Sequence, residues 1–283
     1  TQFQIQYKSR HMNTETLDLE SEYTITGEQI ERFQSDGYIK LKNVLSPEVI
    51  AHYQAEITKT VNALNQETRE MNARDTYSKA FLQIMNLWRT NAVVEEFIKS
   101  KRLGRIATQL MGVSGVRLYH DQALYKEPSG GYTPWHVDQY YWPLSNNNTV
   151  TAWIPLQAVP MEKGPLEFSI GSQSIAFGRD LEISDASEKK IDEHLKLSDL
   201  PIDSSPFDLG EVSFHYGYTF HRAGPNTTDQ TRKIMTIIYM DKDMRLAEPK
   251  NQNQQNDWDT WMPDATIGEI IDTKLNPVIY QEK

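Results

Sequence analysis

The chain has 283 residues and no cysteine, and its 29 lysines and arginines stand against 39 aspartates and glutamates, a formal net charge of −10. The lack of cysteine excludes disulfides, zinc-thiolate sites, iron-sulfur clusters and cysteine nucleophiles, so any metal must be bound by nitrogen and oxygen ligands. The acidic balance argues against a broad surface for nucleic acid. We expect a small-molecule substrate and no obligate protein partner.

The ends and the length of the chain give further expectations. No apolar run approaches the roughly 20 residues that span a bilayer, and the first residues lack the pattern of a secretory signal. We therefore expect a cytoplasmic protein with no membrane partner. Residues 1–12 read like a cloning-derived or disordered leader, and a chain of this length can form one domain, so residues 13–283 are predicted to be a single domain.

Helical patterns come first along the chain. A capping box opens a helix over residues 26–36, and a Ser-Pro pair opens a longer helix at residue 46. Residues 38–41 alternate like a short strand. A further helical pattern runs from residue 94 to a glycine at 112, whereas residues 81–88 are too short and too apolar to assign.

The second half of the chain is mainly strands. The segments rich in β-branched and aromatic residues are 116–126, 149–156, 211–216 and 233–239. Residues 178–207 look like an excursion between strands, with a helical piece at 185–195, and are a candidate lid. The Asn- and Gln-rich run 251–256 is predicted to be a solvated loop. Helices followed by strands indicate an α+β fold, with the helices packed outside a mainly β sandwich or barrel.

The first candidate metal ligands are a histidine and a carboxylate two residues apart, His136 and Asp138. In an extended strand both side chains point to the same face, so both can reach one ion. Alone this pattern has little weight, because a chain of this composition contains a His-x-acid triplet about once by chance.

Two later histidines, His215 and His221, supply a candidate third ligand, and Arg232 follows them. Two histidines and one carboxylate leave three positions of an octahedral ion open, which suits iron(II) that binds a bidentate co-substrate and O2. If residues 224–229 form a hairpin turn, Arg232 runs back beside His221 and can bind the free carboxylate of 2-oxoglutarate. Spacing alone does not choose between the two histidines, although His221 lies directly before the proposed turn.

These segments resemble the phytanoyl-CoA dioxygenase family of iron(II)- and 2-oxoglutarate-dependent oxygenases. The resemblance extends over most of the chain from about residue 26 to residue 240, in the family's order. The motifs that carry it are 33–37, 120–128, 135–138, 149–156, 164–166, 171–172 and 215–232.

The resemblance implies a double-stranded β-helix, a cupin-like jelly roll, with flanking N-terminal helices. It implies that His136, Asp138 and His221 bind the metal and that Arg232 and Gln122 contact 2-oxoglutarate. Residues 13–283 are then a single oxygenase domain.

Asp138 also bears on the outcome of the reaction. In halogenating relatives a small residue replaces this carboxylate so that chloride can take its coordination position. The resemblance therefore favours hydroxylation of a small organic substrate, with release of succinate and CO2. The implied cofactors are Fe(2+), 2-oxoglutarate and O2, with ascorbate as a stimulant, and His215 is expected beside the metal or in the core.

Substrate contacts are expected from aromatic and polar residues around the first ligand pair and from one residue of the helical half. Because side chains alternate along a strand, some of them must instead pack the barrel. The candidates are Tyr132, Trp135, Gln139, Tyr141, Trp142 and Gln83.

Two other functions share parts of this pattern. A non-catalytic cupin-like protein that binds a metal or a small molecule would keep the barrel and two histidines, and a His2Asp metal-dependent hydrolase would keep all three ligands. Neither function requires Arg232 at its position, so the arginine discriminates between them and the oxygenase.

Overall fold

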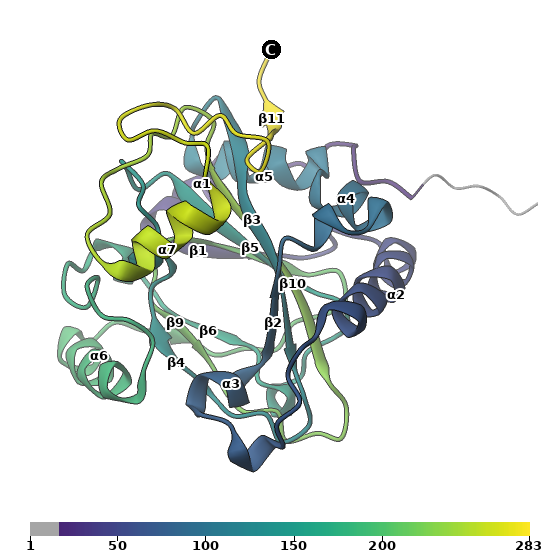
Figure 1. Cartoon of the computed structure of the whole chain (residues 1–283), viewed down its shortest axis with the longest axis vertical. Helices are drawn as coiled ribbons and strands as arrows, with labels where there is room; N and C mark the ends of the chain where they lie inside the picture. Colours follow the sequence, from purple (N-terminus) through teal and green to yellow (C-terminus); the bar gives the residue numbers. More distant parts are fainter. Residues whose placement is uncertain (1–16) are drawn as a thin grey trace, which may run out of the picture.

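Two antiparallel sheets face each other in the computed structural model, which describes residues 17–283 (Figure 1). The predicted leader at residues 1–12 lies outside the described residues. The large sheet has the strand order β1-β8-β5-β10-β3-β11, with β2 also paired to β3, and the small sheet has the order β4-β9-β6-β7. The strands are β1 (Tyr38–Leu41), β2 (Leu82–Met85), β3 (Gly115–Lys126), β4 (Thr133–His136), β5 (Thr149–Pro155), β6 (Leu166–Ser169), β7 (Ile202–Asp203), β8 (Val212–Tyr216), β9 (His221–Ala223), β10 (Arg232–Asp241) and β11 (Val278–Gln281).

Seven α-helices lie around these sheets in the described part of the chain. They are α1 (Gly27–Asp36), α2 (Pro47–Leu64), α3 (Thr76–Ala80), α4 (Ala92–Ile98), α5 (Lys101–Met111), α6 (Asp185–Ser198) and α7 (Gln252–Trp261). None of the described helices is long and apolar enough to cross a membrane.

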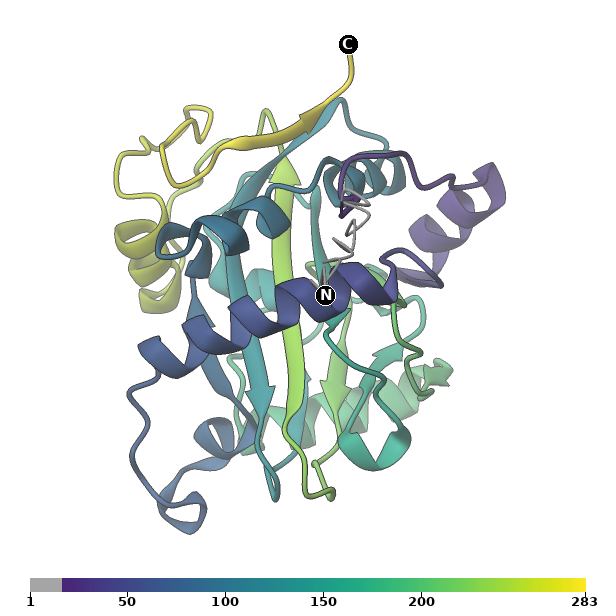
Figure 2. The ribbon, with the colours of Figure 1, turned by 90° about the vertical axis from the view of Figure 1, so that its right-hand side faces the viewer.

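The large sheet uses its two faces differently, as β10 shows. Met235 and Ile237 pack in one buried cluster with Ile57 of α2, and Figure 2 shows α2 lying across the strands of this sheet. The alternate residues Thr236 and Ile238 line a cavity on the opposite face. The period of two along the strand therefore separates the helix-covered core from the inside of the sandwich.

The predicted helical starts are confirmed, with one difference further along. Thr26 and Gln29 form the capping box of α1, and the Ser46 side chain accepts a hydrogen bond from the Val49 amide at the start of α2. The pattern at 94–112 forms two helices instead of one, because the chain leaves α4 at Lys99 and a new N-cap, Ser100, begins α5.

The predicted solvated loop at 251–256 is wrong, because these residues begin α7. Asn251 caps the helix by accepting a hydrogen bond from the Gln254 amide. Gln254 is buried and donates from its side chain to the carbonyl of Tyr140. The amide side chains therefore find partners in the fold that composition alone does not predict.

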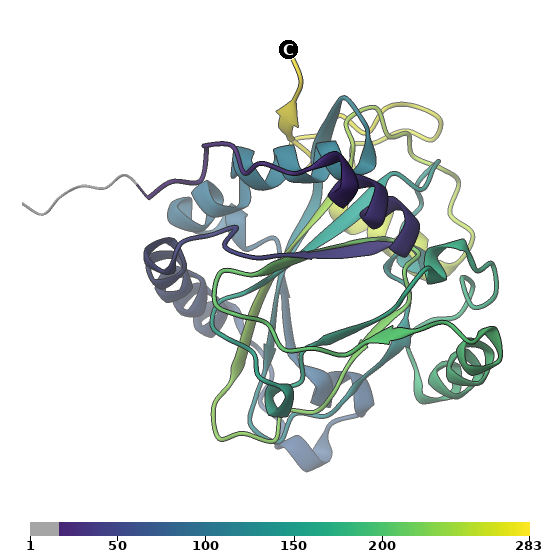
Figure 3. The ribbon, with the colours of Figure 1, turned by 180° about the vertical axis from the view of Figure 1, so that it is seen from behind.

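The segment between β6 and β8 carries the predicted helical piece, which extends from Asp185 to Ser198 as α6. Figures 1 and 3 both show α6 beside the small sheet. Its Ile191 and Leu195 pack with Trp135 and Phe220 in a buried cluster. The excursion is thus a packed layer on the outside of the strands that carry the candidate metal ligands.

Candidate metal centre

Three candidate ligands converge at one end of the small sheet. His136 ends β4 and His221 begins β9, and the two residues are paired across these antiparallel strands. Asp138 Oδ1 lies 3.5 Å from His136 Nε2 and 3.4 Å from His221 Nε2. One ligand atom from each of the three residues lies within 4.8 Å of the others, which is close enough for a single ion.

The hydrogen bonds of the two imidazoles orient them toward the same point. His136 Nδ1 lies 2.7 Å from the carbonyl of Pro134, and His221 Nδ1 lies 2.9 Å from the carbonyl of Thr219. A carbonyl can only accept, so each Nδ1 carries the proton and each Nε2 keeps a lone pair. Both lone pairs are therefore available to a metal, and backbone carbonyls hold the rings in place.

The protonation states of the ligands also suit a metal. Burial alone would raise the pKa of Asp138, but His221, His136 and His215 together lower it well below its usual range. Burial and the neighbouring His221 lower the pKa of His136. The carboxylate is therefore charged and this imidazole neutral at neutral pH, as metal binding requires.

The expectation that His136 and Asp138 both lie in a strand is wrong for the second residue. The strand β4 ends at His136, and Asp138 begins the short 3-10 helix η3 (Asp138–Tyr141). The two side chains still meet because the chain turns there. Their proximity follows from this turn and not from strand alternation.

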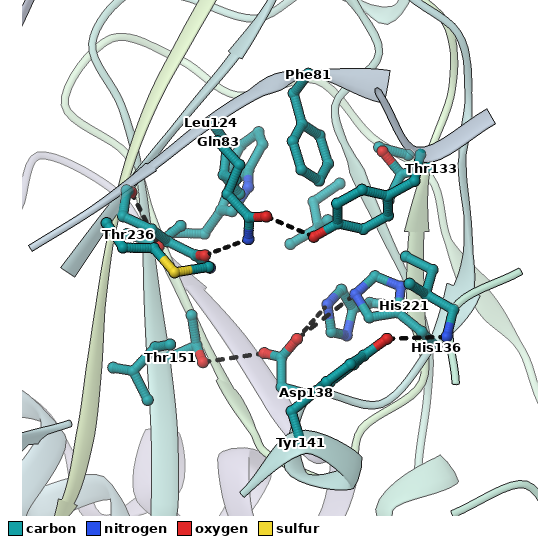
Figure 4. A pocket seen from close by; sticks show the side chains of 18 of the residues that line it. Phe81, Gln83, Leu124, Thr133, His136, Asp138, Tyr141, Thr151, His221 and Thr236 are labelled. Carbon is teal, nitrogen blue, oxygen red and sulfur yellow. Dashed lines mark hydrogen bonds and ion pairs between the residues drawn. The ribbon is translucent and has the colours of Figure 1, made fainter. Parts of the chain in front are cut away.

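His215, the other candidate for third ligand, contacts the oxygen of the Asp138 carboxylate that is not the one nearest His136 and His221. Its Nε2 lies 3.0 Å from Asp138 Oδ2, and Thr151 donates to the same oxygen at 3.1 Å. Figure 4 shows Thr151 and Asp138 joined in this way, with His136 and His221 on the other side of the carboxylate. The structure therefore places His221, and not His215, in the group of three.

Arg232 lines the same cavity as the three ligands. Its guanidinium is almost fully buried, donates from Nη1 to the carbonyl of Gly164 and lies over the ring of Trp153 at 5.4 Å. Its Nε is buried and has no hydrogen-bond partner among the described residues. Burial lowers the pKa of Arg232 to about 9, which leaves it charged at neutral pH. A buried cation with a free donor is suited to an anionic ligand.

The predicted hairpin between His221 and Arg232 is wrong. β9 belongs to the small sheet and pairs with β4 and β6, whereas β10 belongs to the large sheet and pairs with β3 and β5. The chain crosses from one sheet to the other between them. Arg232 therefore faces the metal ligands across the sandwich instead of lying beside His221 on a neighbouring strand.

Residues 33–234 match the family model described as Phytanoyl-CoA dioxygenase (PhyH). The chain belongs to this family. The family and the dioxygenase class predicted from the sequence are thereby confirmed.

Two relatives of the chain are distant from it in sequence. The chain is 23% identical over 224 residues to a probable alpha-ketoglutarate-dependent hypophosphite dioxygenase of Stutzerimonas stutzeri, covering 75% of this chain and 77% of the relative. It is 25% identical over 227 residues to methylphosphonate hydroxylase of Gimesia maris, covering 76% and 81%.

A solved structure shares the fold. The non-heme alpha ketoglutarate dependent carbocyclase SnoK from nogalamycin biosynthesis superimposes with a TM-score of 0.75 at 23% identity, over 90% of this chain and 97% of SnoK. The predicted jelly roll, an α+β fold with a mainly β core, is confirmed.

The cavity of this family member has a volume of about 410 Å³ and extends from Arg232 past the three ligands. Gln122 lines it, and the Gln83 side-chain nitrogen donates to the side-chain oxygen of Gln122 at 2.8 Å, while the Gln83 side-chain oxygen accepts from the Tyr77 hydroxyl at 2.7 Å. Other lining residues are Phe81, Met85, His120, Leu124, Thr133, Tyr141, Trp142, Trp153, Leu166, Glu182, Ile183, Ala223, Thr236, Ile238, Asn253 and Asp257.

Of the six predicted substrate contacts, Gln83, Tyr141 and Trp142 line this cavity. Tyr132, Trp135 and Gln139 do not, for separate reasons. The Tyr132 hydroxyl bonds to Asp185 at the surface, and Trp135 is buried against α6.

Gln139 is held by local hydrogen bonds. Its side-chain nitrogen donates to the carbonyl of Asn146 and its oxygen accepts from Thr149, both at 2.8 Å. Its side chain is thereby turned toward the loop that leads into β5 and away from the cavity.

Sequence reasoning missed Lys126, which is opposite Arg232 in the β3–β10 register. It is fully buried, and its Nζ contacts the carbonyl of Gly131 and the hydroxyl of Thr133. Burial and the nearby arginine lower the pKa of Lys126 to about 6. The available signal was that this lysine ends a strand rich in apolar residues. Because lysine is rarely fully buried, this position alone does not predict that Lys126 is buried.

The candidate lid reaches the cavity at two residues, Glu182 and Ile183. The amide of Ile183 donates to the Tyr141 hydroxyl at 3.0 Å, and Asp185 accepts from Thr76 at 2.8 Å. The segment is therefore tied to both halves of the chain at the cavity wall.

The contact between His215 and Asp138 gives a test of the supporting role. We expect His215→Phe to weaken iron(II) binding about 10- to 100-fold, because groups that orient a metal ligand typically have effects of this size. Affinity can be measured by competition with a chelator, alongside the urea midpoint of the metal-free protein. His52→Phe, at an exposed position of α2, is the matched control. An unchanged iron affinity in His215→Phe would show that the contact is only structural.

Proposed function

We propose that this protein is an iron(II)- and 2-oxoglutarate-dependent dioxygenase that hydroxylates a small organic substrate and releases succinate and CO2. The observation that supports it most is that His136, Asp138, His221 and the buried Arg232 line one cavity. Membership in the phytanoyl-CoA dioxygenase family supports the same reaction class.

The residues present fit an iron(II) ion. Two imidazole nitrogens and one carboxylate oxygen are the donor set of iron(II) oxygenases, and they leave coordination positions for 2-oxoglutarate and O2. When bound, iron(II) with 2-oxoglutarate and O2 supplies an oxidant strong enough to remove hydrogen from an unactivated carbon. His136, Asp138 and His221 would hold the ion in this proposal.

Arg232 would bind the far carboxylate of 2-oxoglutarate. Its Nε, which has no partner in the part of the chain that the structure describes, and its burial beside Trp153 support this role, because a buried guanidinium needs an anion to offset the cost of desolvation. Lys126 is opposite Arg232 in the strand register but does not line the cavity, whereas Leu124 and Leu166 supply apolar walls for the carbon chain. These walls exclude water from the reacting atoms.

In the proposal Asp138 is a metal ligand, and the two oxygens of its carboxylate have different partners. One carboxylate oxygen faces the two imidazoles, while the other is held by His215 and Thr151. The carboxylate cannot rotate without breaking these two hydrogen bonds. Its presence leaves no place for a halide in the ligand set, which favours hydroxylation.

The chain is proposed to act as one oxygenase domain over residues 13–283. The described part supports this because each sheet contributes to the cavity: the small sheet carries the two histidines, and the large sheet carries Arg232 and Gln122. The relatives named for hypophosphite and methylphosphonate suggest that the substrate is a small molecule.

Turnover of the co-substrate tests the reaction class. Purified protein with iron(II), ascorbate and O2 should convert 2-oxoglutarate into succinate at a slow rate even before the substrate is known, since the family chemistry can run uncoupled. Succinate can be quantified by mass spectrometry, with Asp138→Ala as the control. If the wild-type protein neither forms succinate nor binds 2-oxoglutarate, a metal-dependent hydrolase or a binding protein becomes the better assignment.

Separate variants test the separate roles. His136→Ala should abolish stoichiometric iron(II) binding, whereas Arg232→Ala should retain iron and weaken 2-oxoglutarate roughly 10- to 100-fold, the worth of one or two charge-assisted hydrogen bonds. Calorimetry under anaerobic conditions measures both affinities. Arg32→Ala, at an exposed position of α1, should change neither. Unaltered 2-oxoglutarate affinity in Arg232→Ala would remove the arginine from the co-substrate site.

A further inference from the structure

The cavity has two ends, which the register of β3 and β10 separates. Lys126 is opposite Arg232, and His120 is opposite Ile238, so the two pairs lie six residues apart along both strands (126 to 120 and 232 to 238). At about 3.3 Å per residue this separation is roughly 20 Å. The Arg232 end is proposed for the co-substrate, and the His120 end remains for the substrate.

Asp257 of α7 lines the cavity at the His120 end. It accepts a hydrogen bond from the Tyr119 hydroxyl at 2.7 Å, and the ring of Trp261, one turn later in α7, lies 5.0 Å from the ring of His120. These contacts fix the helix against β3, so the carboxyl group of Asp257 is held at the wall of the cavity. Burial raises the pKa of Asp257 to about 7, and a cation bound beside it would favour its charged form.

Glu182, from the segment before α6, places a second carboxylate beside α7. Its Oε2 lies 3.4 Å from Asn253 Nδ2, and both residues line the cavity. Asn253 and Asp257 are four residues apart on α7, so they lie on the same face about one turn, roughly 5.4 Å, from each other. Glu182 and Asp257 thus form an acidic wall on the substrate side.

Among the described residues that line the cavity, Arg232 is the single lysine or arginine, and it lies at the end opposite the acidic wall. Burial lowers the pKa of His120 to about 4, so this histidine is neutral. The charges of iron(II), the 2-oxoglutarate dianion, Asp138 and Arg232 cancel one another. The charge that a substrate meets is therefore set by the acidic wall.

Aromatic rings complete the substrate side. Tyr141 and Trp142 line the cavity next to the acidic wall, since the Tyr141 hydroxyl accepts from Ile183, the neighbour of Glu182, and the ring of Trp142 lies 5.2 Å from the ring of Tyr119. The faces of such rings attract organic cations. Carboxylates together with aromatic rings are a combination that recognises a substituted ammonium group.

We propose that the substrate is a small organic ammonium compound whose charged group binds at Glu182 and Asp257, against Tyr141 and Trp142. This inference rests on the proposed dioxygenase function, because it assigns the substrate side of the same cavity. An oxyanion would meet the Glu182 carboxylate and the carboxyl group of Asp257 there, with no lysine or arginine among the described residues that line this end of the cavity, which costs binding free energy. The chain should therefore discriminate against hypophosphite and methylphosphonate, the compounds after which two relatives are named.

Three probes that share a cyclohexyl ring test the charge preference: cyclohexylammonium, cyclohexanol and cyclohexanecarboxylate. Each is titrated by calorimetry into the full chain loaded with iron(II) and 2-oxoglutarate without O2, so the readout is binding and not turnover. We expect the ammonium probe to bind at least about tenfold more tightly than the alcohol and the carboxylate, because one close opposite charge at a partly buried site has an effect of this order.

Matched variants test whether Glu182 and Asp257 cause the preference for the ammonium probe. Glu182→Gln and Asp257→Asn should each reduce the ratio of ammonium to alcohol affinity about fivefold or more, because each removes one negative charge and keeps the shape of the side chain. Glu182 is exposed, and the amide oxygen introduced by Asp257→Asn can still accept from the Tyr119 hydroxyl, so both variants should fold. Asp259→Asn, the same substitution at an exposed position of α7, should leave the ratio unchanged.

Several results would overturn the inference: equal or tighter binding of the carboxylate probe, a preference that survives both cavity variants, or no binding of any probe. A different result would contradict the proposed function. Absence of 2-oxoglutarate binding in the same instrument would contradict the dioxygenase, whereas normal 2-oxoglutarate binding without ammonium preference would contradict only the substrate class.

Discussion

The antiparallel pairing of β4 with β9 is the constraint on which the site depends. It places His136 directly opposite His221, with 4.2 Å between the ring centroids, and backbone carbonyls fix the tautomer of both rings. Because side chains alternate along a strand, a slip of one residue in this pairing would turn one imidazole to the outer face. Asp138 then completes the group as the chain turns out of β4, held by His215 from the large sheet.

The two sheets contribute different residues to the site. The small sheet carries both histidines, whereas Arg232 and the support for Asp138 come from the large sheet. The distance from the metal centre to Arg232 is therefore set by how the sheets face each other. Helix α2 packs on the outer face of β10 and holds that strand in place, so residues far from the cavity contribute to its geometry (Figure 2).

The sequence predicted the elements whose signals are local and missed those that depend on neighbours. Capping at Thr26 and Ser46 was readable because the capping side chain and its partner lie three residues apart. The helix at 251–256 was not readable, since Gln254 is buried against a chain segment more than a hundred residues away. The candidate ligands were identified through motif order and family resemblance. Their geometry was partly misjudged, because periodicity cannot tell which strands share a sheet, and the supposed hairpin before Arg232 is a crossover between sheets.

A crystal structure of the anaerobic complex with iron(II) and 2-oxoglutarate tests the proposed metal and co-substrate site most directly. We predict one ion bound by Nε2 of His136, Nε2 of His221 and Oδ1 of Asp138, with the far carboxylate of the diacid on Arg232 and His215 still bonded to Asp138. An ion bound by His215, or a diacid whose free carboxylate lies away from Arg232, would contradict it.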